Sequence, residues 1–312
     1  MTSRRNRTLT EFTVDNTMAL RGVLAVSILL FHYICFFPTR WKPLFDDSGY
    51  YICSAFFLFS GYGLAKSWQR RGDDYLRHYW RGRLSTLLPV WLFSSIVCPI
   101  LRNKTDIWQL LHDWIINGDT LNPFTWFINV LILCYLSFYL SARLLKRPAQ
   151  VVIALWLLTI GQIVLLSFTD RGNEWYISQL ALPIGFTIAC YEHMINKRHL
   201  QLAAIACAIG YCAAYLLFGL SEYTFVGITA ASLFGILLYI MVRFGITFSI
   251  KPLRYLGSIS LEIYVLQGIS FTIMNENHIN HPYAFYLTFF GSIVAAAGFH
   301  ALTCKIKECL HK

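Results

Sequence analysis

The stretch MALRGVLAVSILLFHYICFFP, residues 18–38, is an apolar run long enough to span a membrane, and it carries two polar side chains, Arg21 and His32. At 3.6 residues per turn, the eleven residues from one to the other make three turns and about 20°, so both side chains project from nearly the same helix face. Their separation along the axis is about 16 Å, roughly half the hydrocarbon thickness of a bilayer. Such a helix can hold a long anionic ligand at its cation and place the ligand's other end beside the imidazole.

The composition of the whole chain is that of a membrane protein. Of its 312 residues, 56% are hydrophobic and only 13% are charged, whereas about a quarter of an average soluble domain is charged. The net charge of +10 comes from short basic clusters between apolar segments, which excludes a nucleic-acid partner and fits orientation in a membrane. The nine cysteines lie mostly in apolar runs, so we expect buried small hydrophobes, with no disulfide and no metal site.

Ten apolar segments are long enough to cross a bilayer, which predicts an all-α, polytopic bundle of about ten transmembrane helices. A cytoplasmic N-terminus puts twenty of the 26 lysines and arginines in the cytoplasm, five outside and Arg21 within the first span. Both termini are therefore expected in the cytoplasm. No cleavable signal peptide is visible and the loops are short, so residues 1–312 are expected to form a single transmembrane domain with no soluble fused domain. The expected spans are 16–37, 50–67, 84–101, 124–144, 149–168, 175–193, 199–219, 223–243, 255–274 and 283–303.

The pair in the first span has a chemical interpretation. A histidine deep in a membrane helix faces protein or a water-filled cavity, and it marks a functional site by default. A buried imidazole is neutral at pH 7 and can accept a proton, as a general base acting on a hydroxyl must. Arg21 alone has a simpler explanation, because an arginine near a helix end often extends to the lipid headgroups. The shared face favours a functional pair of Arg21 and His32.

A basic cluster lies between Arg70 and Arg83, in an expected cytoplasmic loop and helix start. Arg77 and Arg81 are four residues apart, so on a helix they share a face and can converge on phosphate oxygens. Orientation in the membrane, or binding of lipid headgroups, explains such a cluster equally well when it is taken alone. Its position on the same side as Arg21 favours a phosphorylated ligand held by Arg77, Arg81 and Arg83.

Polar groups also occur in later spans. The glycines of Ser60-Gly61-Tyr62-Gly63 are expected to permit close helix packing, whereas the hydroxyls of Ser60 and Tyr62 can contribute to a buried site. Glu262 lies inside an apolar segment, so it must be protonated or paired. Pairing with His32 or Arg21 would make Glu262 the orienting carboxylate of a catalytic pair, and the alternative is a structural ion pair between helices.

The remaining candidates concern the substrate. Trp126 and Asn129 open the fourth span on the outer side, where they line an acceptor cleft or simply anchor the helix. Tyr264 and Gln267, in the same span as Glu262, are further candidate substrate contacts. His300, in the last span, has no companion in the sequence and is expected to be a packing or interfacial histidine.

Together these motifs resemble the membrane acyltransferase-3 family, transmembrane enzymes that O-acylate bacterial surface sugars, over essentially the whole chain. The resemblance implies that Arg21 and His32 are essential, and that the arginines of the basic loop bind the acyl donor, usually acetyl-CoA from the cytoplasm. Two departures matter: many members have a histidine near the position of Gln267, and no fused extracytoplasmic hydrolase-like domain is present. The motifs are LRG at 20–22 followed by His32, FFLFSGY at 56–62, RGRL at 81–84 with Pro89, Trp126-Phe127, and LGSISLEIY at 256–264.

The predicted function is a membrane O-acyltransferase of the bacterial plasma (inner) membrane. It would move an acetyl or other short acyl group from cytoplasmic acyl-CoA to a hydroxyl of a surface polysaccharide or its lipid-linked precursor, with His32 as general base. Direct attack and an acylated enzyme both fit the residues. The alternative is a proton-coupled transporter or flippase of an anionic or lipid-linked substrate, although no inverted repeat is evident. A membrane scaffold would leave the intramembrane charges unexplained.

Overall fold

The computed structural model describes residues 9–37, 40, 42–45, 47–104, 106–117, 121–169, 171–218 and 224–310. Within these ranges every regular element is helical, which confirms the predicted all-α class. Six helices are long and apolar enough to cross a membrane, and a seventh span results if one bent pair is counted as a unit. The chain is thus a multi-pass membrane protein. Residues 219 and 223, at the ends of two expected spans, lie outside the described residues.

The six long apolar helices coincide with spans expected from the sequence. The last of them, Tyr283–Cys309, comprises the short helix α14 (Tyr283–Phe285), a π-helical segment, Tyr286–Gly291, and most of α15 (Ser292–Leu310). The bent pair consists of α12 (Lys251–Ser258) and α13 (Ser260–Glu276), which meet at 72°. The other five of the six are α1 (Val14–Phe36), α5 (Tyr79–Leu101), α7 (Trp126–Leu144), α8 (Pro148–Ser167) and α11 (Thr224–Arg243).

Three other expected spans form helices that are not among the six. The segment 175–193 is interrupted, because α9 covers only Ala181–Tyr191 between two 3₁₀ turns, Asn173–Trp175 and Glu192–Met194. Eleven helical residues rise about 16 Å, roughly half of what a bilayer requires. The other two are α3 (Ser48–Arg71) and α10 (Lys197–Phe218). The structure therefore supports six or seven spans, and the count of ten remains a prediction.

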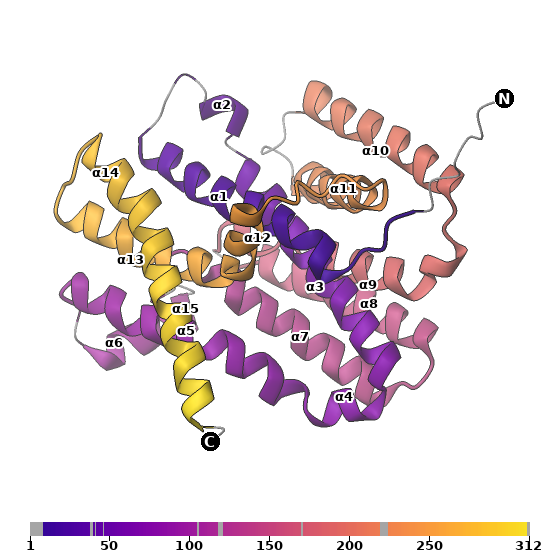
Figure 1. The fold of residues 1–312 in the computed structure, drawn as a ribbon, viewed down its shortest axis with the longest axis horizontal. Helices are drawn as coiled ribbons and strands as arrows, with labels where there is room; N and C mark the ends of the chain where they lie inside the picture. Colours follow the sequence, from indigo (N-terminus) through magenta and orange to yellow (C-terminus); the bar gives the residue numbers. More distant parts are fainter. Residues whose placement is uncertain are drawn as a thin grey trace.

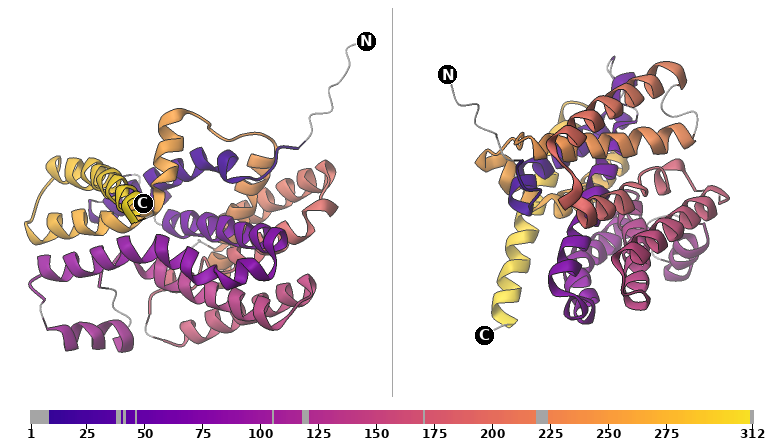
Figure 2. Two further views of the ribbon diagram at one scale, coloured as in Figure 1. Left: turned by 60° about the horizontal axis from the view of Figure 1, so that its bottom comes forward. Right: turned by 90° about the vertical axis from the view of Figure 1, so that its right-hand side faces the viewer.

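Helix α3 runs through the middle of the bundle (Figure 1), and it contacts α1, α9 and α11. Its buried residues are distributed around the whole helix, so α3 faces protein on most sides and needs little lipid-facing apolar surface. Helices α10 and α11 pack together at the edge of the bundle, as the two views in Figure 2 show. The short helices α2 (Lys42–Phe45), α4 (Asp73–Arg77) and α6 (Ile107–His112) lie in the connections.

The crossing of α3 and α9 is a close backbone approach. A Cβ atom added to Gly61 would clash with the backbone oxygen of Leu182, and one added to Gly185 would clash with the oxygen of Leu58. Gly63, two residues further along α3, has open space beside it. The expected packing role of the glycines therefore applies to Gly61, which sets the distance between two central helices.

Candidate active site

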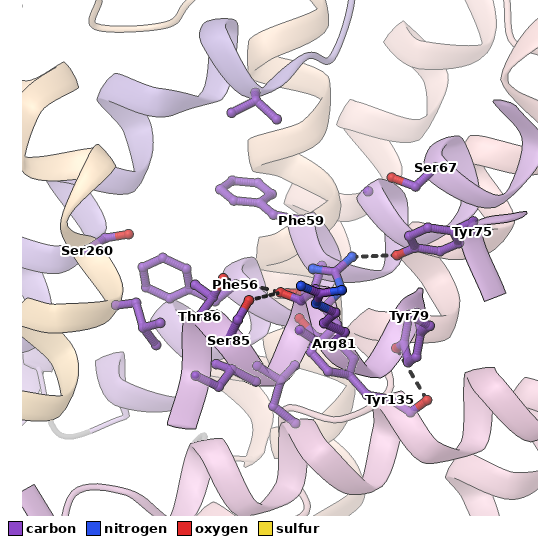
Figure 3. A pocket seen from close by; sticks show the side chains of 18 of the residues that line it. Phe56, Phe59, Ser67, Tyr75, Tyr79, Arg81, Ser85, Thr86, Tyr135 and Ser260 are labelled. Atoms are coloured by element: carbon purple, nitrogen blue, oxygen red, sulfur yellow. Dashed lines mark hydrogen bonds between the residues drawn. The ribbon is translucent and has the colours of Figure 1, made fainter. Parts of the chain in front are cut away.

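A pocket of about 970 Å³ lies between α1, α3, α5, α7 and α13 (Figure 3). It extends along α3 from Phe56 to Arg71, a rise of about 22 Å. On α5 it is lined by residues between Tyr79 and Leu87, and on α1 by Val14 and Arg21. Its volume is at the upper end of the range usual for small-molecule sites, so it can enclose most of a large ligand.

The charged side chains that line this pocket are all basic. Among the side chains that line it, in the part of the chain that the structure describes, there is no carboxylate. A pocket with several cations and no acid is suited to a ligand with multiple phosphates, which guanidinium groups bind in a bidentate manner. The cations are Arg21, Arg71, Arg81, Arg83 and Lys307.

Two of these arginines are held by aromatic neighbours. Arg83 donates a hydrogen bond of 2.8 Å to the hydroxyl of Tyr75, drawn as a dashed line in Figure 3, and its guanidinium lies 5.0 Å from the ring centre of Tyr135. The Arg21 guanidinium lies 5.7 Å from the ring centre of Phe59, and its buried Nε–H has no hydrogen-bond partner among the described residues. A buried, unpartnered donor costs about 1–3 kcal/mol or more for a charged group, so an oxygen of a bound anion would stabilise this position.

The part of the pocket farthest from Arg71 along α3 is mainly apolar. Phe56 and Phe59 of α3 face residues of α7 and α13 there, and Phe127 and Tyr264 pack edge to face with ring centres 5.2 Å apart. The pocket is thus basic towards Arg71 and mainly aromatic towards Phe56 and Tyr264, with Arg21 beside Phe59 as the cation nearest the aromatic part. A ligand with an anionic head and a thin, weakly polar arm matches this gradient.

His32 does not line the pocket. Its Nδ1 is 2.9 Å from Oε1 of Gln267, an acceptor, so Nδ1 carries the proton and Nε2 holds the free lone pair. Rings of Phe124 and Phe271 stand edge-on to the imidazole at 4.5 and 6.1 Å, and no described residue hydrogen-bonds Nε2. His32 is thus held in the tautomer that a general base requires.

Gln267 connects His32 with the pocket. Its side chain is fully buried, and its Nε2 donates a 2.9 Å hydrogen bond to the backbone oxygen of Tyr264. Tyr264 lines the pocket one helical turn before Gln267 on α13. A direct contact of Gln267 with the substrate remains a prediction. Its observed contacts favour another role, which is to orient the imidazole of His32.

Glu262 does not pair with His32 or Arg21, so that expectation is wrong. Its Oε1 lies 2.7 Å from Nδ1 of His300 on α15, and this also corrects the expectation that His300 has no companion. The reason is angular: Glu262 and Gln267 are five residues apart, about 140° around α13, so they face different helices. Glu262 bridges α13 and α15, as in the structural ion-pair alternative.

Tyr62 does not reach the pocket, because it is about 200° from Ser60 around α3, and Ser60 lines the pocket. The Tyr62 hydroxyl instead donates a 2.6 Å hydrogen bond to Oε2 of Glu192. Glu192 also forms ion pairs with Lys66, at 2.6 Å, and with Arg243. The cluster joins α3 to α11 through the turn after α9.

Arg77 is exposed and does not line the pocket, whereas Arg81 and Arg83 do. The expected common face of Arg77 and Arg81 is lost because α4 ends at Arg77 and α5 begins at Tyr79, with a break at His78. The pocket instead recruits two cations that motif spacing did not single out: Arg71, from the basic loop, and Lys307, from the basic C-terminal helix.

Trp126 and Asn129 are half-buried at the start of α7, and neither lines the pocket. The Trp126 ring contacts that of Phe127 at 6.1 Å. Their contact with an acceptor remains a prediction. Within the described ranges, no group of three or more His, Cys, Asp or Glu side chains is arranged to hold a metal ion.

A family model described as an acyltransferase domain matches residues 18–301, which include nearly all of the pocket, together with His32 and Gln267. The chain belongs to the acyltransferase-3 family. This confirms the resemblance inferred from the motifs, and it favours an enzyme over the transporter or flippase alternative. No match was found among curated proteins or among solved structures. As an acyltransferase-3 protein, it is a membrane acyltransferase that requires an acyl donor and an acceptor.

Proposed function

We propose that this acyltransferase moves an acetyl or other short acyl group from acyl-CoA, most simply acetyl-CoA, to a hydroxyl of a cell-surface polysaccharide or its lipid-linked precursor in the bacterial inner membrane. The observation that carries the proposal is the pocket, which has five cations, no carboxylate among its described lining and an apolar region near Tyr264. Its charge and shape suit a multiply phosphorylated nucleotide on a long thin arm.

The proposed topology brings this donor in from the cytoplasm. We retain about ten spans with both termini cytoplasmic, as the distribution of lysines and arginines favours. The pocket is lined by the first residue of α1, the last of α3, the first of α5 and the second half of α15, all on that side. Arg71, Arg81 and Lys307 would then meet the phosphates, while Arg21 and Arg83 hold those that lie deeper.

In the direct form of the reaction, the acceptor hydroxyl gives its proton to Nε2 of His32 as its oxygen attacks the thioester carbonyl carbon. The carbon–sulfur bond then breaks, and the CoA thiolate takes the proton from the imidazolium. Gln267 keeps Nδ1 protonated throughout, so Nε2 is available in each cycle. The products are an acyl ester and free CoA.

The test is purified protein in lipid nanodiscs, incubated with acetyl-CoA with and without membranes that carry bacterial surface glycans. Free CoA should be quantified by chromatography, because a thiol dye would also react with exposed cysteines of the protein, which are Cys35, Cys212, Cys304 and Cys309. We expect CoA binding and acceptor-stimulated release of CoA. A protein that neither binds CoA nor releases it from acetyl-CoA would overturn the proposed function.

Arg81→Ala is expected to raise the KM for acetyl-CoA by about tenfold, the lower range for a charge-assisted hydrogen bond, because Arg81 is exposed at the pocket rim. The kcat at saturating donor should change little. Arg77→Ala is the matched control, since Arg77 is an exposed arginine four residues away and outside the pocket lining. Equal effects of both substitutions would argue against a donor site at Arg81, and a lower kcat for Arg81→Ala would place it in the chemistry.

A further inference from the structure

The hydroxyl of Tyr264 is buried in the protein without a hydrogen bond to any described residue. Tyr264 is 5% exposed and lines the pocket, and no hydrogen-bond partner for its hydroxyl is found among the described residues. Two other pocket tyrosines differ in this respect: the Tyr75 hydroxyl accepts a bond from Arg83, and that of Tyr79 donates to the backbone oxygen of Tyr135. A buried, unpartnered hydroxyl costs about 1–3 kcal/mol, a cost that a ligand acceptor would offset.

The position of Tyr264 relates it to the proposed base. Its backbone oxygen accepts the bond from Gln267, and the same Gln267 side chain holds His32. Tyr264 and Gln267 are three residues apart, about 60° around α13 and about 4.5 Å along it. Along α13, Tyr264 is thus the pocket-lining residue next to Gln267, the residue that holds His32.

We propose that Tyr264 is a catalytic residue of the transfer, whose hydroxyl donates a hydrogen bond to the acyl carbonyl oxygen of the donor. As the acceptor oxygen attacks, the carbonyl π electrons move onto this oxygen, and the phenol stabilises the charge that develops there. The oxyanion then collapses and expels the CoA thiolate, which takes the proton that His32 received from the acceptor. Tyr264 keeps its own proton, so its role is electrostatic. This inference rests on the proposed function and adds a residue to it.

The test is Tyr264→Phe, which removes only the hydroxyl. We expect kcat to fall by about 10²–10³-fold, as when one oxyanion donor is removed. Affinity for CoA, which lacks the acyl carbonyl, should change less than twofold. The melting temperature should stay the same or rise, because the hydroxyl has no partner in the described chain. A merely structural role predicts the opposite, a lower melting temperature with kcat preserved.

Two further variants make the result specific. Tyr51→Phe removes a hydroxyl from another buried tyrosine, on α3, whose ring packs against Tyr211 and Phe234 away from the pocket, and its activity should match the wild type. Tyr75→Phe should raise the KM for acetyl-CoA through Arg83 and leave kcat unchanged at saturating donor. If the wild type transfers acyl groups and Tyr264→Phe has the wild-type kcat, the role of Tyr264 is refuted. If the wild type neither binds CoA nor transfers, the proposed function itself fails.

Discussion

His32→Ala is expected to lower kcat for acyl transfer by about 10²–10⁴-fold, the range that a positioned general base contributes. The Nδ1 of the His32 imidazole is hydrogen-bonded to Gln267, and its Nε2 has no hydrogen-bond partner among the described residues. Because His32 does not line the pocket, the Kd for CoA should stay within twofold of the wild-type value. Single-turnover transfer and calorimetric titration with CoA measure the two quantities separately.

The matched control for His32 is His199→Ala, an exposed histidine at the start of α10, which should leave transfer unchanged. Gln267→Leu should have an intermediate effect, because His32 keeps its ring but loses the acceptor that selects its tautomer. Transfer by His32→Ala within threefold of the wild type would show that the base is elsewhere. Loss of CoA binding in the same variant would instead assign His32 a structural role.

The second large effect concerns folding: Gly61→Leu should prevent accumulation of a monodisperse protein. At Gly61 even a Cβ atom collides with the backbone oxygen of Leu182, and a backbone atom cannot move aside as the tip of a side chain can. Gly61→Ala should therefore cost about 1–3 kcal/mol of stability, the range for overpacking a well-packed site. Size-exclusion profiles and thermal unfolding in one detergent measure both variants.

Gly63→Ala provides a comparison within the same helix. It has open space beside it, and alanine is favoured over glycine in a helix by about 0.5–1 kcal/mol, so stability should stay the same or increase slightly. Gly61→Ala is thus expected to lower the stability, whereas Gly63→Ala should leave it unchanged or raise it slightly. Equal melting temperatures for both variants would contradict the close approach of α3 and α9.

The helical class and the main chemical groups could be predicted from the sequence, because these depend on local properties. Apolar length and the placement of lysine and arginine indicate membrane helices whatever their neighbours are. The positions of Arg21 and His32 on one face follow from helix geometry alone. The structure places Arg21 in the pocket and joins His32 to Gln267, one turn from the pocket-lining Tyr264. The basic loop was likewise recognisable, since Arg81 and Arg83 do line the pocket.

Contacts between helices were decided only by the tertiary structure. Glu262 pairs with His300, and Tyr62 with Glu192, because the rotation of each helix about its axis selects which side chains face each other. The break at His78 separates Arg77 from Arg81, and the 72° bend between α12 and α13 sets the course of the helix that carries Tyr264 and Gln267. Periodicity within one helix determines which residues share a face, whereas the crossing of helices determines what that face meets.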